Sequence, residues 1–191
     1  MTTLKDQQIE WHRYRTRLER ETRVLIVDSD AGVSEQLHDL LFRLHIPARS
    51  VSSAEQALEQ VAGGNYAVVI TAEVIRGMRG LALTRQLRVT QPEIDVVLTS
   101  WDPSVPTLSQ AFELRLLDLL LKPFDDLDIV TKVMIQAVKR SVDRRMRSHV
   151  LGELRGLLQR LDPDARLRTT AALDQRLSAY KRLLGRFDRV L

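Results

Sequence analysis

The sequence predicts an α/β protein built around one parallel β-sheet. The first observation is that five short apolar segments alternate with helix-like segments within about a hundred residues. The second is that these segments are nearly continuous apolar runs, as residues 24–27 illustrate, which is typical of strands covered on both faces. Right-handed crossovers leave few arrangements for five such strands, and the flavodoxin-like strand order is the natural one at this size.

The individual elements follow from the period of the apolar residues and from the turn residues between them. Ser53, with Gln56 three residues later, resembles a capping box that opens a helix, and Gly63 and Gly64 end that helix. Pro103 and Pro106 indicate a loop before a helix that begins near residue 108. The predicted strands are 24–27, 48–51, 66–71, 95–99 and 117–121, and the predicted helices between them are 33–44, 53–61, 81–89 and 108–115.

Helical segments flank this region on both sides, so we expect three parts: an N-terminal helix (1–22), a central domain (23–140) and a helical extension (141–191). Residues 3–21 form a polar helix with a thin apolar stripe. Residues 125–161 contain no proline and continue the last helix well past the sheet, and a turn at 162–164 starts another. The last helix has a heptad seam that predicts an antiparallel hairpin or coiled coil, and the partner of this seam is the N-terminal helix, a second copy of the chain in a dimer, or both: Leu173, Leu177, Tyr180, Leu184, Phe187 and Leu191.

Composition limits the classes of function. The chain has 191 residues and no cysteine, which excludes disulfides and thiolate metal sites. No segment is long and apolar enough for a signal peptide or a membrane span, so we expect a soluble cytoplasmic protein. Residues 24–137 carry 9 Lys and Arg against 15 Asp and Glu, whereas residues 138–191 carry 14 against 6. This asymmetry indicates separate parts with different partners.

Charged and hydroxyl residues follow the predicted strands. The strand ends present Asp28, Ser29 and Asp30, then Thr71, Ala72 and Glu73, then Thr99 and Ser100, and finally Lys122 and Pro123. Because the carboxyl ends of parallel strands meet at one edge of the sheet, we expect these residues to form a compact charged pocket.

This pattern resembles the response-regulator receiver domain, the chemotaxis-type signalling module, over about residues 23–140. The resemblance lies in residues 24–30 (VLIVDSD), 66–80 (YAVVITAEVIRGMRG), 97–100 (VLTS) and 120–124 (LLKPF). It implies a two-component signalling role, a conserved-type hydroxyl at Thr99, a lysine at Lys122 that contacts a phosphoryl group, and a cis bond before Pro123.

The sequence departs from this family at the residues that carry its chemistry. Counting back from Gly80 places the aspartate that accepts the phosphoryl group at Ala72, which has no nucleophile. Ser29 replaces an acid that ligates magnesium in the family, and magnesium prefers carboxylate oxygens. Arg76 stands where proline is usual and Leu119 where a switching aromatic is frequent. We therefore expect no catalytic residue and no cofactor, with Mg²⁺ binding lost or weak at Asp28 and Asp30.

The remaining pocket residues also have simpler interpretations. Asp30 is expected to cap the following helix rather than to bind a metal. Glu73 is adjacent to Ala72 and has the charge to mimic a phosphoryl group, but we expect it to point into solvent. Thr99 is expected to satisfy backbone groups. Lys122, without a phosphoryl group to contact, is expected to pair with Asp28.

Three functions compete. The favoured one is a phosphorylation-independent pseudo-receiver, not an enzyme, that binds a signalling kinase, a scaffold or an output protein and dimerises through its helical segments. The second is nucleic-acid binding by the basic C-terminal helices, which is disfavoured because no helix-turn-helix is evident. The third is phosphotransfer from His149, whose surroundings faintly resemble a phosphoacceptor segment.

Overall fold

The structure of the protein is a computed structural model that describes residues 4–64 and 66–160. The predicted turn at 162–164 and the heptad seam of 173–191 lie outside the described residues. The helices are α1 (Leu4–Glu21), α2 (Ala31–Arg43), α3 (Ala54–Gly63), α4 (Gly80–Thr90), α5 (Val105–Glu113) and α6 (Leu127–Arg160). The strands are β1 (Arg23–Val27), β2 (Ala48–Val51), β3 (Tyr66–Ala72), β4 (Asp95–Ser100) and β5 (Asp118–Leu121).

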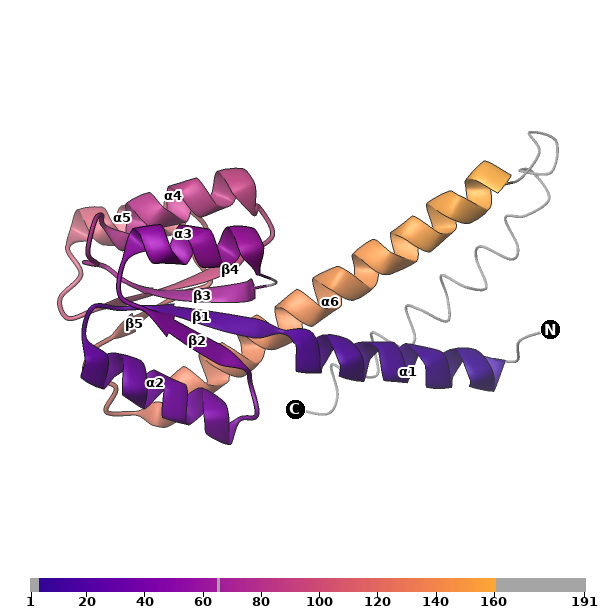
Figure 1. Ribbon diagram of the computed structural model, residues 1–191, viewed down its shortest axis with the longest axis horizontal. Helices are drawn as coiled ribbons and strands as arrows, with labels where there is room; N and C mark the ends of the chain where they lie inside the picture. The colour runs from indigo at the N-terminus through magenta and orange to yellow at the C-terminus, as the bar shows by residue number, and fades with distance from the viewer. Residues whose placement is uncertain (1–3, 65, 161–191) are drawn as a thin grey trace. The chain divides into compact units, whose positions relative to one another are not determined.

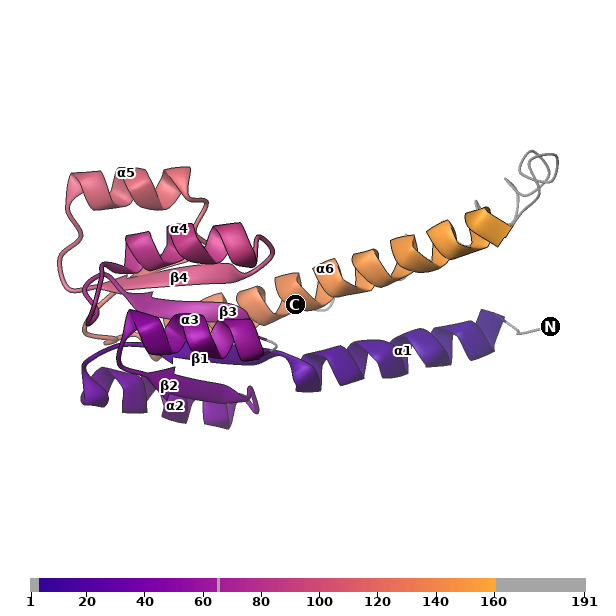
Figure 2. The same ribbon diagram turned by 45° about the horizontal axis from the view of Figure 1, so that its top comes forward.

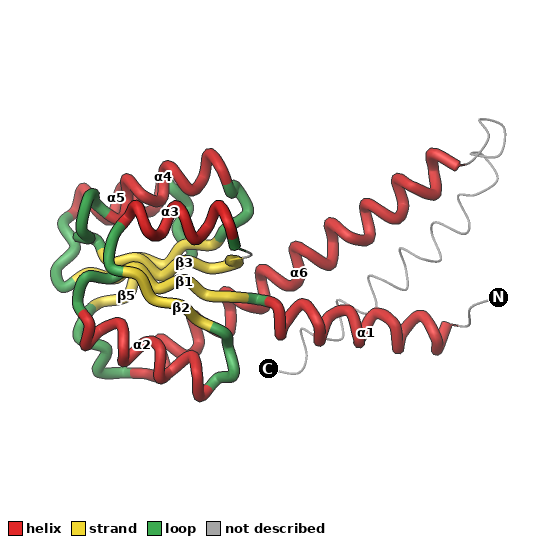
Figure 3. The backbone as a smooth tube through the Cα atoms, viewed as in Figure 1, coloured by secondary structure: helices red, strands yellow, loops and turns green. Residues whose placement is uncertain are grey.

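The five strands form one sheet in the order β2-β1-β3-β4-β5, and every neighbouring pair is parallel (Figures 1 and 3). This arrangement confirms the predicted flavodoxin-like sheet. Its strand order reverses direction between β1 and β3, the point at which an open α/β sheet places its functional site.

Helices cover both faces of the sheet. Helices α3, α4 and α5 follow one another across one face, and α2 and the first part of α6 lie on the other (Figure 2). Alternate residues of β1 point to opposite faces of the sheet. Val24 and Ile26 pack with α2 and α6, whereas Leu25 and Val27 pack with α3 and α4. Two-sided burial explains why the strands read as continuous apolar runs rather than as alternating ones.

Side-chain caps set several helix starts. Asp30 Oδ1 accepts the Gly32 and Val33 backbone N–H groups and so caps α2, as predicted. Ser53 Oγ accepts the Gln56 N–H at the start of α3, while the Gln56 amide oxygen accepts the Ser52 N–H, one residue earlier than a standard capping box.

The prediction for α5 was wrong at its N-terminus. The helix begins at Val105 rather than near residue 108, and Pro106 lies in its first turn. Proline is tolerated there because the first turn leaves its N–H groups without helical partners. Ser104 Oγ accepts the Thr107 N–H and provides the cap.

Helix α6 continues beyond the sheet, as predicted. Arg144 on this helix contacts the beginning of β4: its guanidinium lies 2.7 Å from Asp95 Oδ2 and 3.1 Å from Glu93 Oε2.

The chain divides into two compact units, Met1–Arg145 and Met146–Leu191. No helix in the described part of the chain is long and apolar enough to span a membrane.

Candidate functional site

The strand register brings the predicted site residues to one edge of the sheet. Val27 pairs with Thr71 across β1 and β3, Ala72 pairs with Thr99 across β3 and β4, and Ser100 pairs with Leu121 across β4 and β5. The residues that end or follow these strands therefore share the carboxyl edge. They do not form one acidic cluster, because their side chains divide between two separate sets of contacts.

The first set is an ion pair between the outer members of this edge. Lys122 Nζ donates to Asp28 Oδ2 at 2.5 Å, and both side chains are 4% exposed. The predicted pairing is therefore present. Strands β3 and β4 lie between β1 and β5, so the pair joins the ends of two strands that are not neighbours. The Trp101 ring, with its centroid 5.8 Å from Nζ, adds a cation–π contact.

The other acidic residues after β1 take local roles. Asp28 Oδ1 accepts the Asp30 backbone N–H at 3.0 Å, so both carboxylate oxygens of Asp28 are engaged. Asp30 caps α2, and Ser29 is exposed. No group of three or more His, Cys, Asp or Glu side chains that could hold a metal ion occurs within residues 4–64 and 66–160.

The second set of contacts centres on Glu73, and here the prediction was wrong. Glu73 does not point into solvent: the residue is 8% exposed and its carboxylate has three side-chain donors. Ser100 Oγ donates to Oε2 at 2.5 Å, Thr107 Oγ1 donates to Oε1 at 2.7 Å, and Arg79 Nη2 donates to Oε1 at 3.0 Å. These donors come from β4, from α5 and from the residue before α4.

The protonation of Glu73 follows from these surroundings. Burial alone would raise the pKa of the Glu73 carboxyl. The hydrogen bonds from Ser100, Thr107 and Arg79, together with the positive charge of Arg79, outweigh burial, and the pKa is lowered. Glu73 is therefore ionised at neutral pH.

Ala72 and Thr99 are paired in register at the same edge of the sheet, and both are buried. Among the described residues the Thr99 hydroxyl has no hydrogen-bond partner, so the expectation that it satisfies backbone groups was wrong. A buried hydroxyl without a partner costs roughly 1–3 kcal/mol. The methyl group of Ala72 offers it no acceptor.

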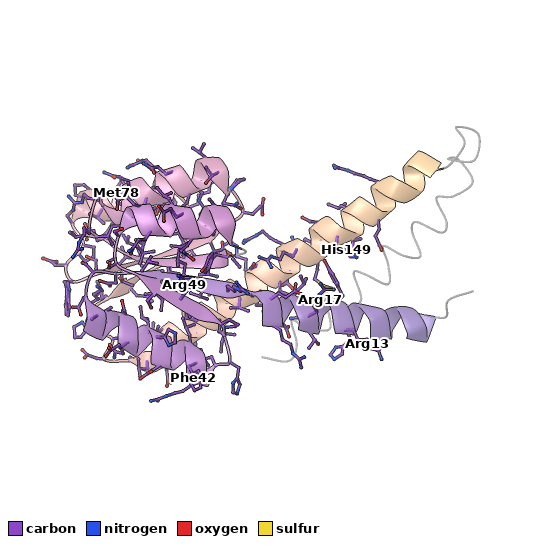
Figure 4. The ribbon with its side chains drawn as sticks, in the orientation of Figure 1. Arg13, Arg17, Phe42, Arg49, Met78 and His149 are labelled. Carbon is purple, nitrogen blue, oxygen red and sulfur yellow. The ribbon has the colours of Figure 1, made fainter. Side chains whose placement is uncertain are left out.

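Two further predicted residues have simple positions. The Lys122–Pro123 peptide bond is cis, as the family resemblance implies. His149 lies on α6 (Figure 4), and its Nε2 is 3.7 Å from Glu153 Oε1 one helical turn away.

Sequence reasoning missed several residues of the Glu73 set. The sequence places Ser100 at the strand ends without indicating its partner, and it does not single out Thr107 or Arg79, because each lies in a different element and only the fold brings them to Glu73. One signal was available: Ser104 and Thr107 are spaced as a helix cap and its third helical residue, which would have moved the start of α5 and placed Thr107 near the strand ends.

Comparison with known proteins identifies the class. The family model of the response regulator receiver domain matches residues 24–134 of the sequence. The chain belongs to this family, and its central domain is a two-component response regulator receiver.

Two individual proteins that resemble this chain share about a quarter of its residues or fewer over the matched segment. The transcriptional regulatory protein FixJ of Bradyrhizobium diazoefficiens is 22% identical over 143 residues, which cover 75% of this chain and 69% of FixJ. The C4-dicarboxylate transport transcriptional regulatory protein DctD of Rhizobium meliloti is 25% identical over 64% of this chain, but the match spans 25% of DctD.

Among solved structures, the signal receiver domain of an HD domain-containing protein from Pseudomonas fluorescens has a TM-score of 0.62 and 27% identity. The likeness covers 67% of this chain and 94% of that one. A response regulator receiver protein from Pseudomonas putida has a TM-score of 0.57 and 26% identity over 61% of this chain.

Proposed function

We propose that this protein is a receiver that does not accept a phosphoryl group and that acts instead through contacts with other proteins. The observation that carries this proposal is the direct ion pair between Lys122 and Asp28, both buried, beside an alanine at the end of β3. The lysine that would contact a phosphoryl group is already neutralised by a residue of the protein itself. Ala72, counted from Gly80, occupies the phosphoacceptor position and supplies no nucleophile.

The donor set at this edge does not fit the magnesium ion that receiver chemistry uses. Asp28 gives one carboxylate oxygen to Lys122 and the other to a backbone N–H. Asp30 is committed to the cap of α2, and Ser29 and Ala72 offer no carboxylate. Magnesium requires near-octahedral oxygen ligands, usually including one or two carboxylates, and these oxygens are engaged elsewhere.

The outer face of α5 supports a role in protein binding. Val105, Leu108 and Phe112 lie on one side of this helix and are 79%, 46% and 88% exposed. Exposed apolar side chains grouped in this way mark interaction surfaces more often than isolated ones do. A signalling kinase, a scaffold or an output protein are the partners expected of a receiver. We place homodimerisation in the helical segments outside the central domain.

The test of this proposal is the response to a phosphoryl analogue. The purified full chain is titrated with beryllofluoride in the presence of Mg²⁺, and thermal unfolding and light scattering are recorded. We expect no saturable change in the melting temperature or in the oligomeric state. A saturable shift of several degrees, lost when fluoride or Mg²⁺ is omitted, would show that the site binds the analogue and would reject the proposal.

Nucleic-acid binding is the second candidate, favoured by two observations. Residues 138–191 carry 14 Lys and Arg against 6 Asp and Glu, and the matched relatives FixJ and DctD are named as transcriptional regulators. Phosphate binding of this kind weakens steeply with salt. A gel-shift titration from low to physiological salt tests it: retardation that fades with salt supports this candidate, and no retardation at low salt rejects it.

A further inference from the structure

We propose that Glu73 is a positioning residue that fixes the start of α5 and the preceding loop by means of its own buried carboxylate. This goes beyond the proposed function, because it names the side chain that holds α5, and with it the exposed face of Val105, Leu108 and Phe112, in position. Glu73 directly follows β3, yet its side chain contacts residues from three other parts of the fold: Ser100 at the end of β4, Arg79 before α4 and Thr107 in the first turn of α5.

The backbone of Glu73 strengthens the same junction. Its N–H donates to the Thr99 carbonyl at 2.8 Å, and its carbonyl accepts the Gly80 N–H at 2.9 Å. The backbones of Gly80 and Ala72 approach each other closely here, since a Cβ atom at Gly80 would collide with the Ala72 carbonyl oxygen. The carboxylate therefore projects from a backbone that is tied to both β4 and α4. These contacts, none of which involves α5, fix the position of the Glu73 backbone.

The connection to α5 runs through the helix cap. Thr107 Oγ1 has one hydrogen, and it donates this hydrogen to the bond with Glu73 Oε1. At the 3.0 Å contact between Ser104 Oγ and Thr107 Oγ1, the Ser104 hydroxyl is therefore the donor. Ser104 Oγ in turn accepts the Thr107 backbone N–H. The cap that begins α5 is thus part of a hydrogen-bond chain that ends on Glu73. Hydrogen bonds to an ionised, buried acceptor are the stronger kind.

This contact weighs more in α5 than it would in another helix, because α5 buries little apolar surface. The buried residues of α5 are Thr107 and Ala111. Helix α2, by contrast, buries four large aliphatic side chains: Val33, Leu37, Leu40 and Leu41. A second polar contact, from Arg85 to Gln110 at 2.9 Å, is exposed and has an uncharged acceptor. The Glu73 carboxylate is therefore the principal buried polar attachment described for α5.

The test measures amide hydrogen exchange by mass spectrometry across the full chain. In Glu73→Ala we expect exchange in residues 104–113 to rise by roughly tenfold or more, since a charge-assisted hydrogen bond is lost at a local opening unit. Exchange in α2 should stay near the wild-type rate. Glu73→Gln keeps the shape and one acceptor oxygen, so it should rescue part of the protection. Glu59→Ala, which removes an exposed glutamate of α3, is the matched control.

Thr107→Val gives a second measurement in case Glu73→Ala fails to fold. It leaves Glu73 with Ser100 and Arg79 and removes the link to α5 together with the contact between the Ser104 and Thr107 hydroxyls, so exchange should rise in residues 104–113 and stay unchanged in β3 and β4. Exchange in α5 within about twofold of wild type in both folded variants, or an equal rise in every helix, would overturn the proposal. Adding beryllofluoride and Mg²⁺ to the wild-type sample separates the two ideas. A response there contradicts the proposed function and leaves the role of Glu73 to be decided by the variants.

Discussion

Lys122 and Asp28 form a buried ion pair between two strand ends, with Nζ 2.5 Å from Oδ2. The Glu73 carboxylate has other partners: it accepts hydrogen bonds from Ser100, Thr107 and Arg79. One anion neutralises the lysine, and the other holds the start of α5. The carboxylates of Asp28 and Glu73 are therefore both engaged by the protein's own side chains.

The first prediction concerns the strength of this pair. Removing one partner leaves an unpaired buried charge, so Lys122→Met and Asp28→Asn should each lower the free energy of unfolding by about 3–5 kcal/mol. The double variant should lose much less than the sum of the two, because neither charge is left alone. Urea unfolding of the four proteins measures the coupling. The exposed pair Arg17–Glu21 is the control, and its loss should change the unfolding free energy far less. Additive effects at Lys122 and Asp28 would contradict the prediction.

The sequence was sufficient for most of the fold and for part of the site. Strands buried on both faces leave a strong apolar signal, and the Lys122–Asp28 pair could be predicted because both residues directly follow strands. The contacts of Glu73 could not. They depend on where Thr107 lies, and Pro106 predicts a loop at Thr107 where the structure has the first turn of α5. A local error of three residues at a helix start thus hid a contact between distant segments.

A second prediction concerns Ala72. Ala72→Asp should not give efficient phosphorylation by acetyl phosphate with Mg²⁺, because Ser29 still lacks a carboxylate and Asp28 remains paired with Lys122. Intact-mass measurement of the full chain after incubation tests this. Ala72→Asp combined with Ser29→Asp is the informative comparison, since it restores both missing carboxylates. Stoichiometric modification of the single variant would mean that the pocket is closer to competence than the pairing suggests.

The third prediction is a pH dependence that originates at Glu73. The pKa of this carboxyl is lowered from its ordinary value of 4.5, so folding favours the ionised form. Its stabilising contribution is complete above the pKa of the unfolded chain and is lost as the pH falls below 4.5 through the lower folded-state pKa. The difference in unfolding free energy between wild type and Glu73→Gln should therefore shrink in acid. Urea unfolding at pH 7 and at a series of pH values below 4.5 measures it. A difference that is constant over this series would show that ionisation of Glu73 contributes nothing.

The last prediction concerns the attachment of α6 to the beginning of β4. Arg144 donates to Asp95 Oδ2 at 2.7 Å and to the Glu93 carbonyl, and the Asp95 side chain is 5% exposed. Arg140 is 3.7 Å from the same carboxylate but is 57% exposed. Because Arg144 supplies directed donors to a buried acceptor, Arg144→Ala should cost about 2 kcal/mol of unfolding free energy. Arg140→Ala, the matched control, should cost less than about 1 kcal/mol. Arg144→Lys keeps the charge but not the fork of donors, so its loss should lie between the two. Equal losses for Arg144→Ala and Arg140→Ala would mean that the attachment depends on net charge near Asp95 rather than on the hydrogen bonds of one guanidinium.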